Sequence, residues 1–186
     1  GIMRKVAVKK ASLPAGMASN EVKGKTTIKP GQLIDILGTQ RINHSVAEKK
    51  DQIGICTGLA YTQVGGDILF IEVATMPGKG QVTLTGQLGN VMKESARAAF
   101  SYVRSHHEQL GLNIKKLNQS DVHVHVPEGA VPKDGPSAGL AITTALISAF
   151  SRRAVKKHLA MTGEVTLRGR ALAIGGVKEK VIAAHR

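Results

Sequence analysis

The chain of 186 residues contains a single cysteine, Cys56, and no tryptophan. One thiol excludes an internal disulfide and any zinc site built from several cysteines, a pattern typical of reducing compartments. Aromatic residues make up only 3% of the chain, so few rings are available for stacking on nucleic-acid bases. No run approaches the roughly 18 apolar residues of a membrane helix, and no signal peptide is visible. These absences predict a soluble, cytoplasmic protein with no membrane partner.

Acidic residues are also scarce. The chain has 13 Asp and Glu against 26 Lys and Arg, which gives a formal net charge of +13. Such a charge permits binding to nucleic acid or another polyanion. The basic residues are scattered, however, with modest clusters at 4–10 and 152–157. Hydrophobic residues reach 42%, enough for an aliphatic core. Nucleic acid is therefore a secondary candidate partner.

The most informative stretch is Pro-Lys-Asp-Gly-Pro-Ser-Ala-Gly at residues 132–139. Gly135 and Pro136 end any helix before them, and an apolar run from 140 to 150 follows. Ser137 is therefore expected at the first turn of a helix, where unpaired N–H groups favour a negative charge. Three interpretations stay open at this point: a helix cap, a phosphate loop, or a nucleophile beside its own oxyanion stabiliser.

A serine nucleophile requires a base, and one candidate is a histidine. His123 and His125 alternate with valines, so they share one face of a predicted strand. With Asp121 or Asp134 as orienting carboxylate they would form a Ser-His-Asp site. Metal binding by this His-x-His pair is the weaker interpretation, because no third ligand beyond Asp121 is evident.

The other candidate base is a lysine. Its pKa of about 10.4 must fall before it can accept a proton at neutral pH, and burial lowers it. The predicted last helix, 177–185, carries Lys178 and Lys180. At about 100° per residue, Lys180 shares a side with Val177, Ala183 and Ala184, and the small alanines leave room for its stem. Lys180 is the better candidate, although most lysines on terminal helices are simply solvated.

The periodicities predict an α+β fold made of short strands, hairpins and helices, with a strand order that patterning does not give. Strand 67–76 is expected to be central because both its faces are apolar. Pro77–Gly80 is expected to be a hairpin loop, because it lacks the Gly-Lys-Ser/Thr of a phosphate loop. The other expected elements are strands 53–62, 80–86 and 121–126, helices 88–110, 140–150 and 177–185, and a hairpin of 158–167 with 171–174.

Upstream of this compact part, residues 1–38 are expected to form the end of a basic helix, a loop and a short helix. Residues 39–51 are polar and are expected to be a linker. The compact domain is then expected to occupy residues 52–186.

Several short stretches, taken together, are characteristic of one protein family. They occur in order at Thr57–Thr62, Val64–Asp67, Gly86–Ser95, His123–Gly129, Pro132–Gly139, Met161–Glu164 and Gly175–Lys180. This set resembles the proteolytic domain of Lon, the ATP-dependent protease, in its soluble bacterial form. The resemblance covers roughly residues 52–186, and it implies a compact α+β Lon-type protease domain.

The resemblance implies a serine endopeptidase that degrades unfolded or damaged proteins through an acyl-enzyme. Ser137 aligns with the family's nucleophile and Lys180 with its lysine, which together form a Ser-Lys dyad. Thr162 matches a threonine that helps to position the dyad, and Asp134 lies in a loop that switches the site between closed and open forms. The supporting residues are thus Thr162, Asp134, Gly135, Pro136, His123 and His125, with the two histidines as neighbours of the site rather than its base.

The resemblance also implies what surrounds the domain. Residues 1–38 would be the tail of an ATPase (AAA+) module and 39–51 a linker, while 52–186 would stop short of the family's final elements. ATP and Mg²⁺ would bind the ATPase module of the same polypeptide, with no cofactor or metal in this chain. The assembly would be a homo-hexamer with its serines facing an enclosed chamber.

Two other functions remain open. One is a non-catalytic Lon-like scaffold on nucleic acid, which the charge permits but which would not need Ser137, Lys180 and Thr162 together. The other is small-molecule phosphotransfer at loop 135–139, although no second phosphate- or metal-binding group accompanies that loop.

Overall fold

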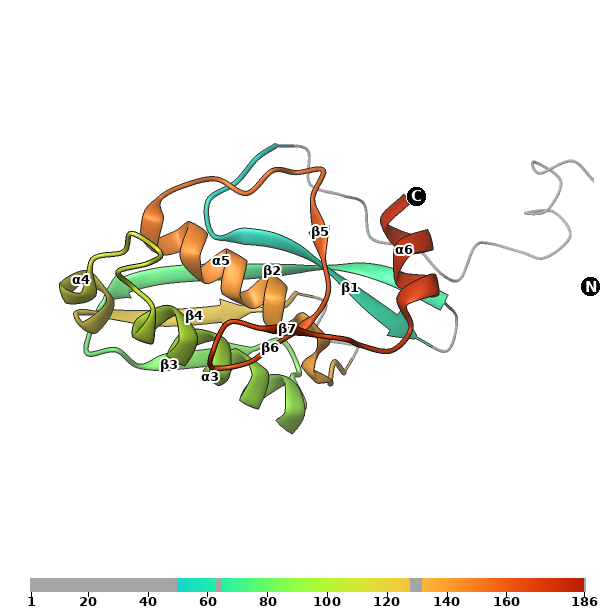
Figure 1. Cartoon of the computed structure of the whole chain (residues 1–186), viewed down its shortest axis with the longest axis horizontal. Coiled ribbons are helices and arrows are strands. Elements are labelled where there is room, and N and C mark those ends of the chain that lie inside the picture. Colours follow the sequence, from blue (N-terminus) through green and yellow to red (C-terminus); the bar gives the residue numbers. More distant parts are fainter. Residues whose placement is uncertain (1–49, 63–64, 128–131, 186) are drawn as a thin grey trace, which may run out of the picture. The chain divides into compact units, whose positions relative to one another are not determined.

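A computed structural model describes residues 50–62, 65–127 and 132–185. The expected helix, loop and short helix of residues 1–38 lie outside the described residues, as does the linker apart from its last two positions. The described part contains a five-stranded mixed sheet, a two-stranded hairpin and helices (Figure 1). None of its helices is both long enough and apolar enough to cross a membrane.

The elements follow one another in an α+β order, which confirms the predicted fold class. They are β1 (Ile55–Thr62), β2 (Gly65–Pro77), β3 (Val82–Thr85), α3 (Asn90–Ser105), α4 (Ile114–Asn118), β4 (Ser120–His125), the 3-10 turn η2 (Pro136–Ala138), α5 (Gly139–Ser151), β5 (Ala160–Met161), β6 (Glu164–Val165), β7 (Ala171–Leu172) and α6 (Val177–His185).

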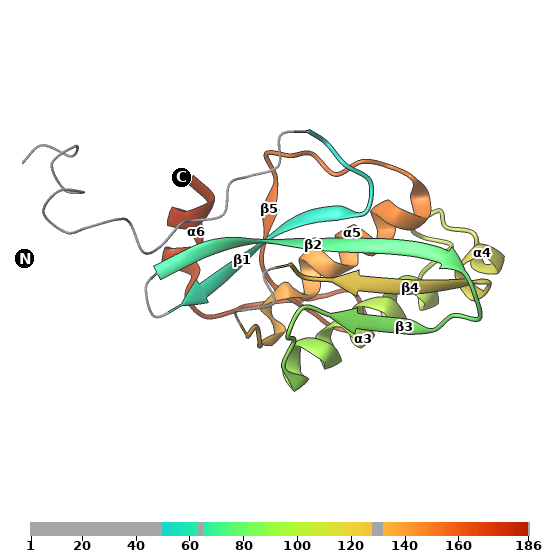
Figure 2. The same ribbon diagram turned by 180° about the vertical axis from the view of Figure 1, so that it is seen from behind.

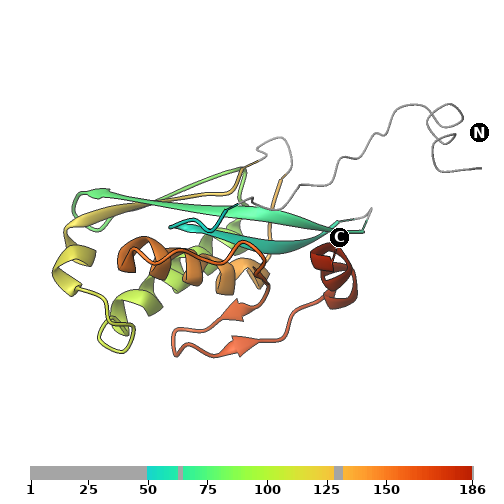
Figure 3. The same ribbon diagram turned by 90° about the horizontal axis from the view of Figure 1, so that it is seen from above.

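The sheet has the order β3-β4-β2-β1-β5, so β2 is central, as its two apolar faces predict. β2 pairs antiparallel with both β1 and β4, whereas β5 and β3 add parallel strands at the two edges. Figure 2 shows the sheet from the side opposite α3 and α5. Figure 3 shows both helices on the other face and the β6–β7 hairpin beyond them.

The core lies between the sheet and these two helices. Val122, Val124 and Val126 alternate inward, while His123 and His125 lie half-buried on the opposite face. α5 is apolar on nearly all sides and is buried along most of its length, as expected for a helix packed between other elements. It is this buried helix that carries the serine loop at its N-terminus.

The prediction of a hairpin loop at Pro77–Gly80 is wrong. β3 does not pair with β2, because β4 lies between them and pairs with both. The Asp121 carboxylate accepts the N–H groups of Lys79 (2.8 Å) and Gln81 (2.9 Å), which holds the loop against the start of β4. The parallel pairing of β3 with β4 then requires a crossover, and α3 and α4 form it.

Two further boundaries differ from expectation. The helix expected over 88–110 spans only Asn90–Ser105, because Ser105 and His106 bond the Tyr102 carbonyl and end it. The strand expected over 158–167 is divided into β5, which joins the main sheet, and β6, which pairs with β7. The backbone between them turns toward Ser137 instead of continuing a ladder.

Cys56 provides a direct check on this core. Its side chain is 1% exposed in β1, and burial raises the pKa of the thiol to about 11. A rise of about two pKa units from the ordinary value lowers the thiolate fraction at pH 7 by roughly 100-fold. We therefore expect the native protein to react with Ellman's reagent at least about 100-fold more slowly than the urea-unfolded protein. Equal rates would contradict the described position of β1.

Candidate active site

Ser137 lies at the start of a helix, as its sequence context predicts. The turn η2 runs directly into α5, and Pro136 occupies its first position, where a missing N–H is harmless. Gly135 precedes it with φ of 115°, a conformation that favours glycine. The short Gly-Pro sequence therefore turns the chain sharply and presents Ser137 in the first helical turn.

Lys180 lies next to this serine although 43 positions separate them in the chain. Its Nζ is 3.0 Å from the Ser137 Oγ and 3.3 Å from the Thr162 Oγ1. The lysine is only 3% exposed. The structure thus brings together Ser137 from the turn before α5, Lys180 from α6 and Thr162 from the segment between β5 and β6.

The packing of α6 explains why this lysine is buried. A Cβ on Gly66 of β2 would lie 2.0 Å from the Glu179 carbonyl oxygen and 3.1 Å from the Ala183 Cβ, so only glycine lets α6 approach so closely. Lys180 and Ala183 are the two buried residues of α6, as predicted, whereas Val177 and Ala184, expected on the same side, are exposed. Its exposed face carries Lys178, Val181 and Ile182.

Burial lowers the pKa of Lys180 below its ordinary value, because an ammonium loses solvation inside the protein. Its described hydrogen-bond partners are two hydroxyls, and within the described ranges no carboxylate pairs with it. Among the described residues, therefore, no opposite charge offsets the desolvation. The neutral amine, whose lone pair accepts a proton, is favoured relative to a surface lysine.

The backbone of Ser137 is held from the side of β6. Its carbonyl accepts the Gly163 N–H at 2.8 Å and the Thr162 hydroxyl at 3.3 Å. The Gly163 carbonyl in turn accepts the Leu140 N–H at 3.0 Å, which bonds this segment to the first turn of α5. Thr162 thus donates to the serine backbone while it accepts from Lys180.

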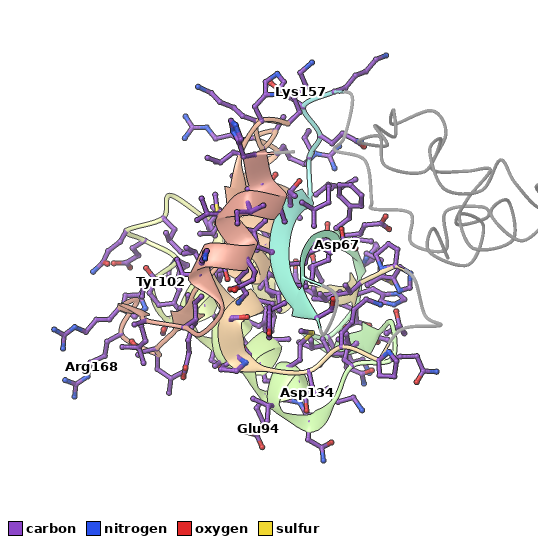
Figure 4. All side chains as sticks on the ribbon, turned by 90° about the vertical axis from the view of Figure 1, so that its right-hand side faces the viewer. Asp67, Glu94, Tyr102, Asp134, Lys157 and Arg168 are labelled. Atoms are coloured by element: carbon purple, nitrogen blue, oxygen red, sulfur yellow. The ribbon has the colours of Figure 1, made fainter. Side chains whose placement is uncertain are left out.

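Asp134 does not contact the lysine in this structure. Its Oδ1 accepts the N–H groups of Met92 (2.9 Å) and Gly135 (2.8 Å), so it caps α3 from outside that helix. These bonds, the Met92 bond first, hold the pKa of the Asp134 carboxyl below its usual range. Figure 4 shows Asp134 beside the start of α3.

His123 and His125 are engaged elsewhere. The His123 Nε2 is 2.8 Å and the His125 Nδ1 2.7 Å from the Thr85 Oγ1 on β3. Neither histidine lines the cleft at Ser137. The described residues contain no cluster of three or more His, Cys, Asp or Glu that fits a metal ion.

A cleft of about 520 Å³ opens at the serine. Most of its walls are aliphatic, and the polar groups Ser137, Lys180, Asp67 and Asp134 lie among them. Its apolar lining includes Leu59, Ile68, Leu69, Met92, Ala138 and Ile174. Such a cleft suits an apolar side chain placed next to the Ser137 hydroxyl.

Phosphate binding does not fit the loop that most resembles a nucleotide site. Lys79 lies in the loop Pro77–Gly80 and Gln81 follows it. The backbone N–H groups of both residues already donate to the Asp121 carboxylate. A phosphate at those amides would face that carboxylate and be repelled. The described residues therefore do not fit ATP at this loop.

Sequence reasoning missed three contributors to the site. Gly66 admits α6, Gly163 holds the Ser137 carbonyl, and Ser95 of α3 donates to the Pro136 carbonyl at 3.2 Å. Each acts through backbone contacts between segments distant in the chain. Their local sequences carry no signal beyond a glycine or a serine in a motif.

Gly89 offers a test of the Asp134 cap. A Cβ there would lie 2.2 Å from the Asp134 Cγ, so Gly89→Ala should push the carboxylate off the start of α3. We expect Tm to fall by roughly 2–4 °C at pH 7 in thermal melts followed by circular dichroism. Because a lowered Asp pKa stabilises only above about pH 4, the difference from the unmodified protein should shrink as the pH falls below that value.

The matched control is Gly175→Ala, since a Cβ at Gly175 meets nothing within 4 Å. Its Tm should stay within about 1 °C of the unmodified value. If Gly89→Ala were as harmless as this control, or if its effect grew in acid, the Asp134 cap would not contribute as described.

Comparison with known proteins identifies the family. The family model described as the Lon protease (S16) C-terminal proteolytic domain matches residues 27–186. Lon protease of Heliobacterium modesticaldum is 56% identical over 162 residues, which are 87% of this chain and 20% of that protein. Lon protease 1 of Bacillus subtilis is 56% identical over 166 residues, 89% of this chain and 21% of that protein.

Lon protease 1 of Myxococcus xanthus is 52% identical over 186 residues, which are 100% of this chain and 22% of that protein. The chain thus spans about a fifth of the length of the curated relatives it matches. Because the family model covers most of its residues, and these relatives agree with it, the chain belongs to the family of Lon protease C-terminal proteolytic domains.

Proposed function

We propose that this chain is a serine endopeptidase in which Ser137 is the nucleophile and Lys180 the general base. One observation carries the proposal: the Lys180 Nζ is 3.0 Å from the Ser137 Oγ and is buried without a described carboxylate partner. A histidine base is not favoured, because His123 and His125 both bond Thr85. A surface lysine would be protonated and unable to accept the serine proton.

The chemistry follows from these positions. Neutral Lys180 accepts the Ser137 hydroxyl proton while Oγ attacks a peptide carbonyl carbon, and the carbonyl π electrons move onto oxygen. Collapse of this intermediate breaks the C–N bond, and the lysine ammonium protonates the leaving amine. Water then attacks the acyl-enzyme carbonyl and gives a proton to the same amine. Collapse breaks the ester C–Oγ bond, the lysine ammonium returns that proton to the Ser137 Oγ, and a carboxylic acid product leaves.

The first helical turn supplies a donor for the developing oxyanion. Pro136 has no N–H, so the Ser137 amide is the first N–H of the turn, and it lies beside the nucleophile itself. The dipole of α5 adds a partial positive charge at this end. Removing one oxyanion donor typically slows catalysis by about 10²–10³-fold.

The cleft also offers a backbone edge for an extended peptide. β1 pairs with β5 only at Thr57 and Gly58, and the continuation of β1 at Leu59–Tyr61 lines the cleft. In the described part of the chain no strand pairs with that outer edge. An unfolded substrate would hydrogen-bond along this edge while one side chain enters the apolar wall.

The wider assembly is part of the same proposal. The protein would act on unfolded or damaged proteins in the cytoplasm as a homo-hexamer. ATP and Mg²⁺ would serve an ATPase module of the same polypeptide that feeds the substrate. The support is the family membership and the resemblance of the quoted stretches, while the loop at Pro77–Gly80 does not fit ATP.

Two substitutions test the dyad in the full-length protein with ATP. Ser137→Ala and Lys180→Met should each reduce cleavage of an unstructured fluorogenic peptide by at least about 10³-fold, because each removes one of the two residues of the proposed dyad. Lys180→Met should keep or raise Tm at pH 7. The sign follows because a lowered lysine pKa means that burying the ammonium destabilises the fold below about pH 10.4.

Lys178→Met is the matched control, because Lys178 lies on the exposed face of the same helix. It should retain activity. Cleavage that survives Lys180→Met would contradict the proposed base. Tight, salt-sensitive DNA binding without any cleavage by the unmodified protein would instead favour a nucleic-acid scaffold.

A further inference from the structure

We propose that Ser95 is a positioning residue that aims the Ser137 N–H at the oxyanion, an inference that rests on the function proposed above. Ser95 lies on α3, and its Oγ donates to the Pro136 carbonyl at 3.2 Å. It does not line the cleft and touches neither Lys180 nor Thr162 through a described hydrogen bond. Any effect on the reaction must therefore pass through the backbone.

The peptide plane provides that path. The Pro136 carbonyl and the Ser137 N–H belong to one planar trans unit, so they point in opposite directions. A hydrogen bond that fixes the carbonyl also fixes the direction of the N–H. Ser95 therefore controls the oxyanion donor from the far side of the same peptide group.

A second donor shows what Ser95 adds. The Pro136 carbonyl also accepts the Gly139 N–H of the helical turn, but that bond lies within the segment that must be oriented. The Ser95 bond comes from α3, a different element with most of its inner face buried. It ties the peptide group to the body of the domain rather than to its own turn.

The packing around Ser95 leaves the hydroxyl little freedom. Its side chain is 9% exposed, and a Cβ on Gly139 would lie 2.9 Å from its Oγ. On the other side of the nucleophile, the Ser137 carbonyl is held by Gly163 and Thr162. The nucleophile is thus held through its two neighbouring carbonyls, one bonded to α3 and the other to the segment before β6.

Ser95→Ala in the full-length protein with ATP tests the proposal. The variant loses one oxygen and keeps the helix, because Ala is the best helix former. We expect kcat for an unstructured peptide to fall by about 10- to 100-fold with KM changed by less than about twofold. The pH profile should keep its shape, because the surroundings of Lys180 are unchanged.

A paired binding measurement separates positioning from general damage. A peptide boronate forms a tetrahedral adduct with Ser137 that places an oxygen at the oxyanion position, whereas the product fragment with the new amino terminus has no acyl oxygen to place there. Ser95→Ala should weaken boronate binding by the same factor as kcat/KM and leave product binding within about twofold.

Ser148→Ala is the matched control, since Ser148 is also a buried helical serine that bonds backbone groups, here of Gly54 and Arg153. It should lower Tm but leave boronate binding and kcat within about twofold. Equal losses in both variants, or boronate and product binding that weaken together in Ser95→Ala, would overturn the positioning role. If the unmodified protein neither cleaved the peptide nor bound the boronate, the proposed function itself would fail.

Discussion

The desolvation of one lysine is the constraint on which the site depends. An ammonium loses much of its hydration when it is buried, and Lys180 has hydroxyls rather than a carboxylate as its described partners. The lysine is buried despite this unfavourable free energy because the backbone of α6 packs directly against the backbone of β2 at Gly66. In the proposed mechanism, this unfavourable burial is what makes the amine available as a base.

The remaining elements hold the serine where this amine can reach it. α3 is the principal support: Met92 bonds Asp134, Ser95 bonds Pro136, and Tyr102 packs on the tip of the β6–β7 hairpin at Gly169. These three positions recur at helical spacing, so one face of α3 meets both the serine loop and the hairpin. Figure 4 shows Tyr102 beside the hairpin that carries Arg168. Because the hairpin joins Gly163 to α6, α3 supports both halves of the site.

Local patterns predicted the parts of this site that depend on local chemistry. Gly135 and Pro136 indicated the turn before Ser137, and the spacing of Lys180 with Ala183 indicated which lysine of the last helix is buried. Local patterns did not predict the features that depend on contacts between segments distant in the chain. Nothing near Pro77–Gly80 shows that β4 inserts between β2 and β3, because the partner that holds the loop, Asp121, lies about 40 positions away. Ser95 was missed for the same reason.

The pH dependence of serine reactivity tests the central claim most directly. The measured quantity is the rate at which a fluorophosphonate labels Ser137 in the full-length protein, followed from about pH 5 to about pH 11. Our account predicts a rate that rises with pH through an apparent pKa below about 10.4, because the base is a buried Lys180, and a loss of this rise in Lys180→Met. An apparent pKa near about 6.5 that persists in Lys180→Met would contradict it and assign the base to a histidine.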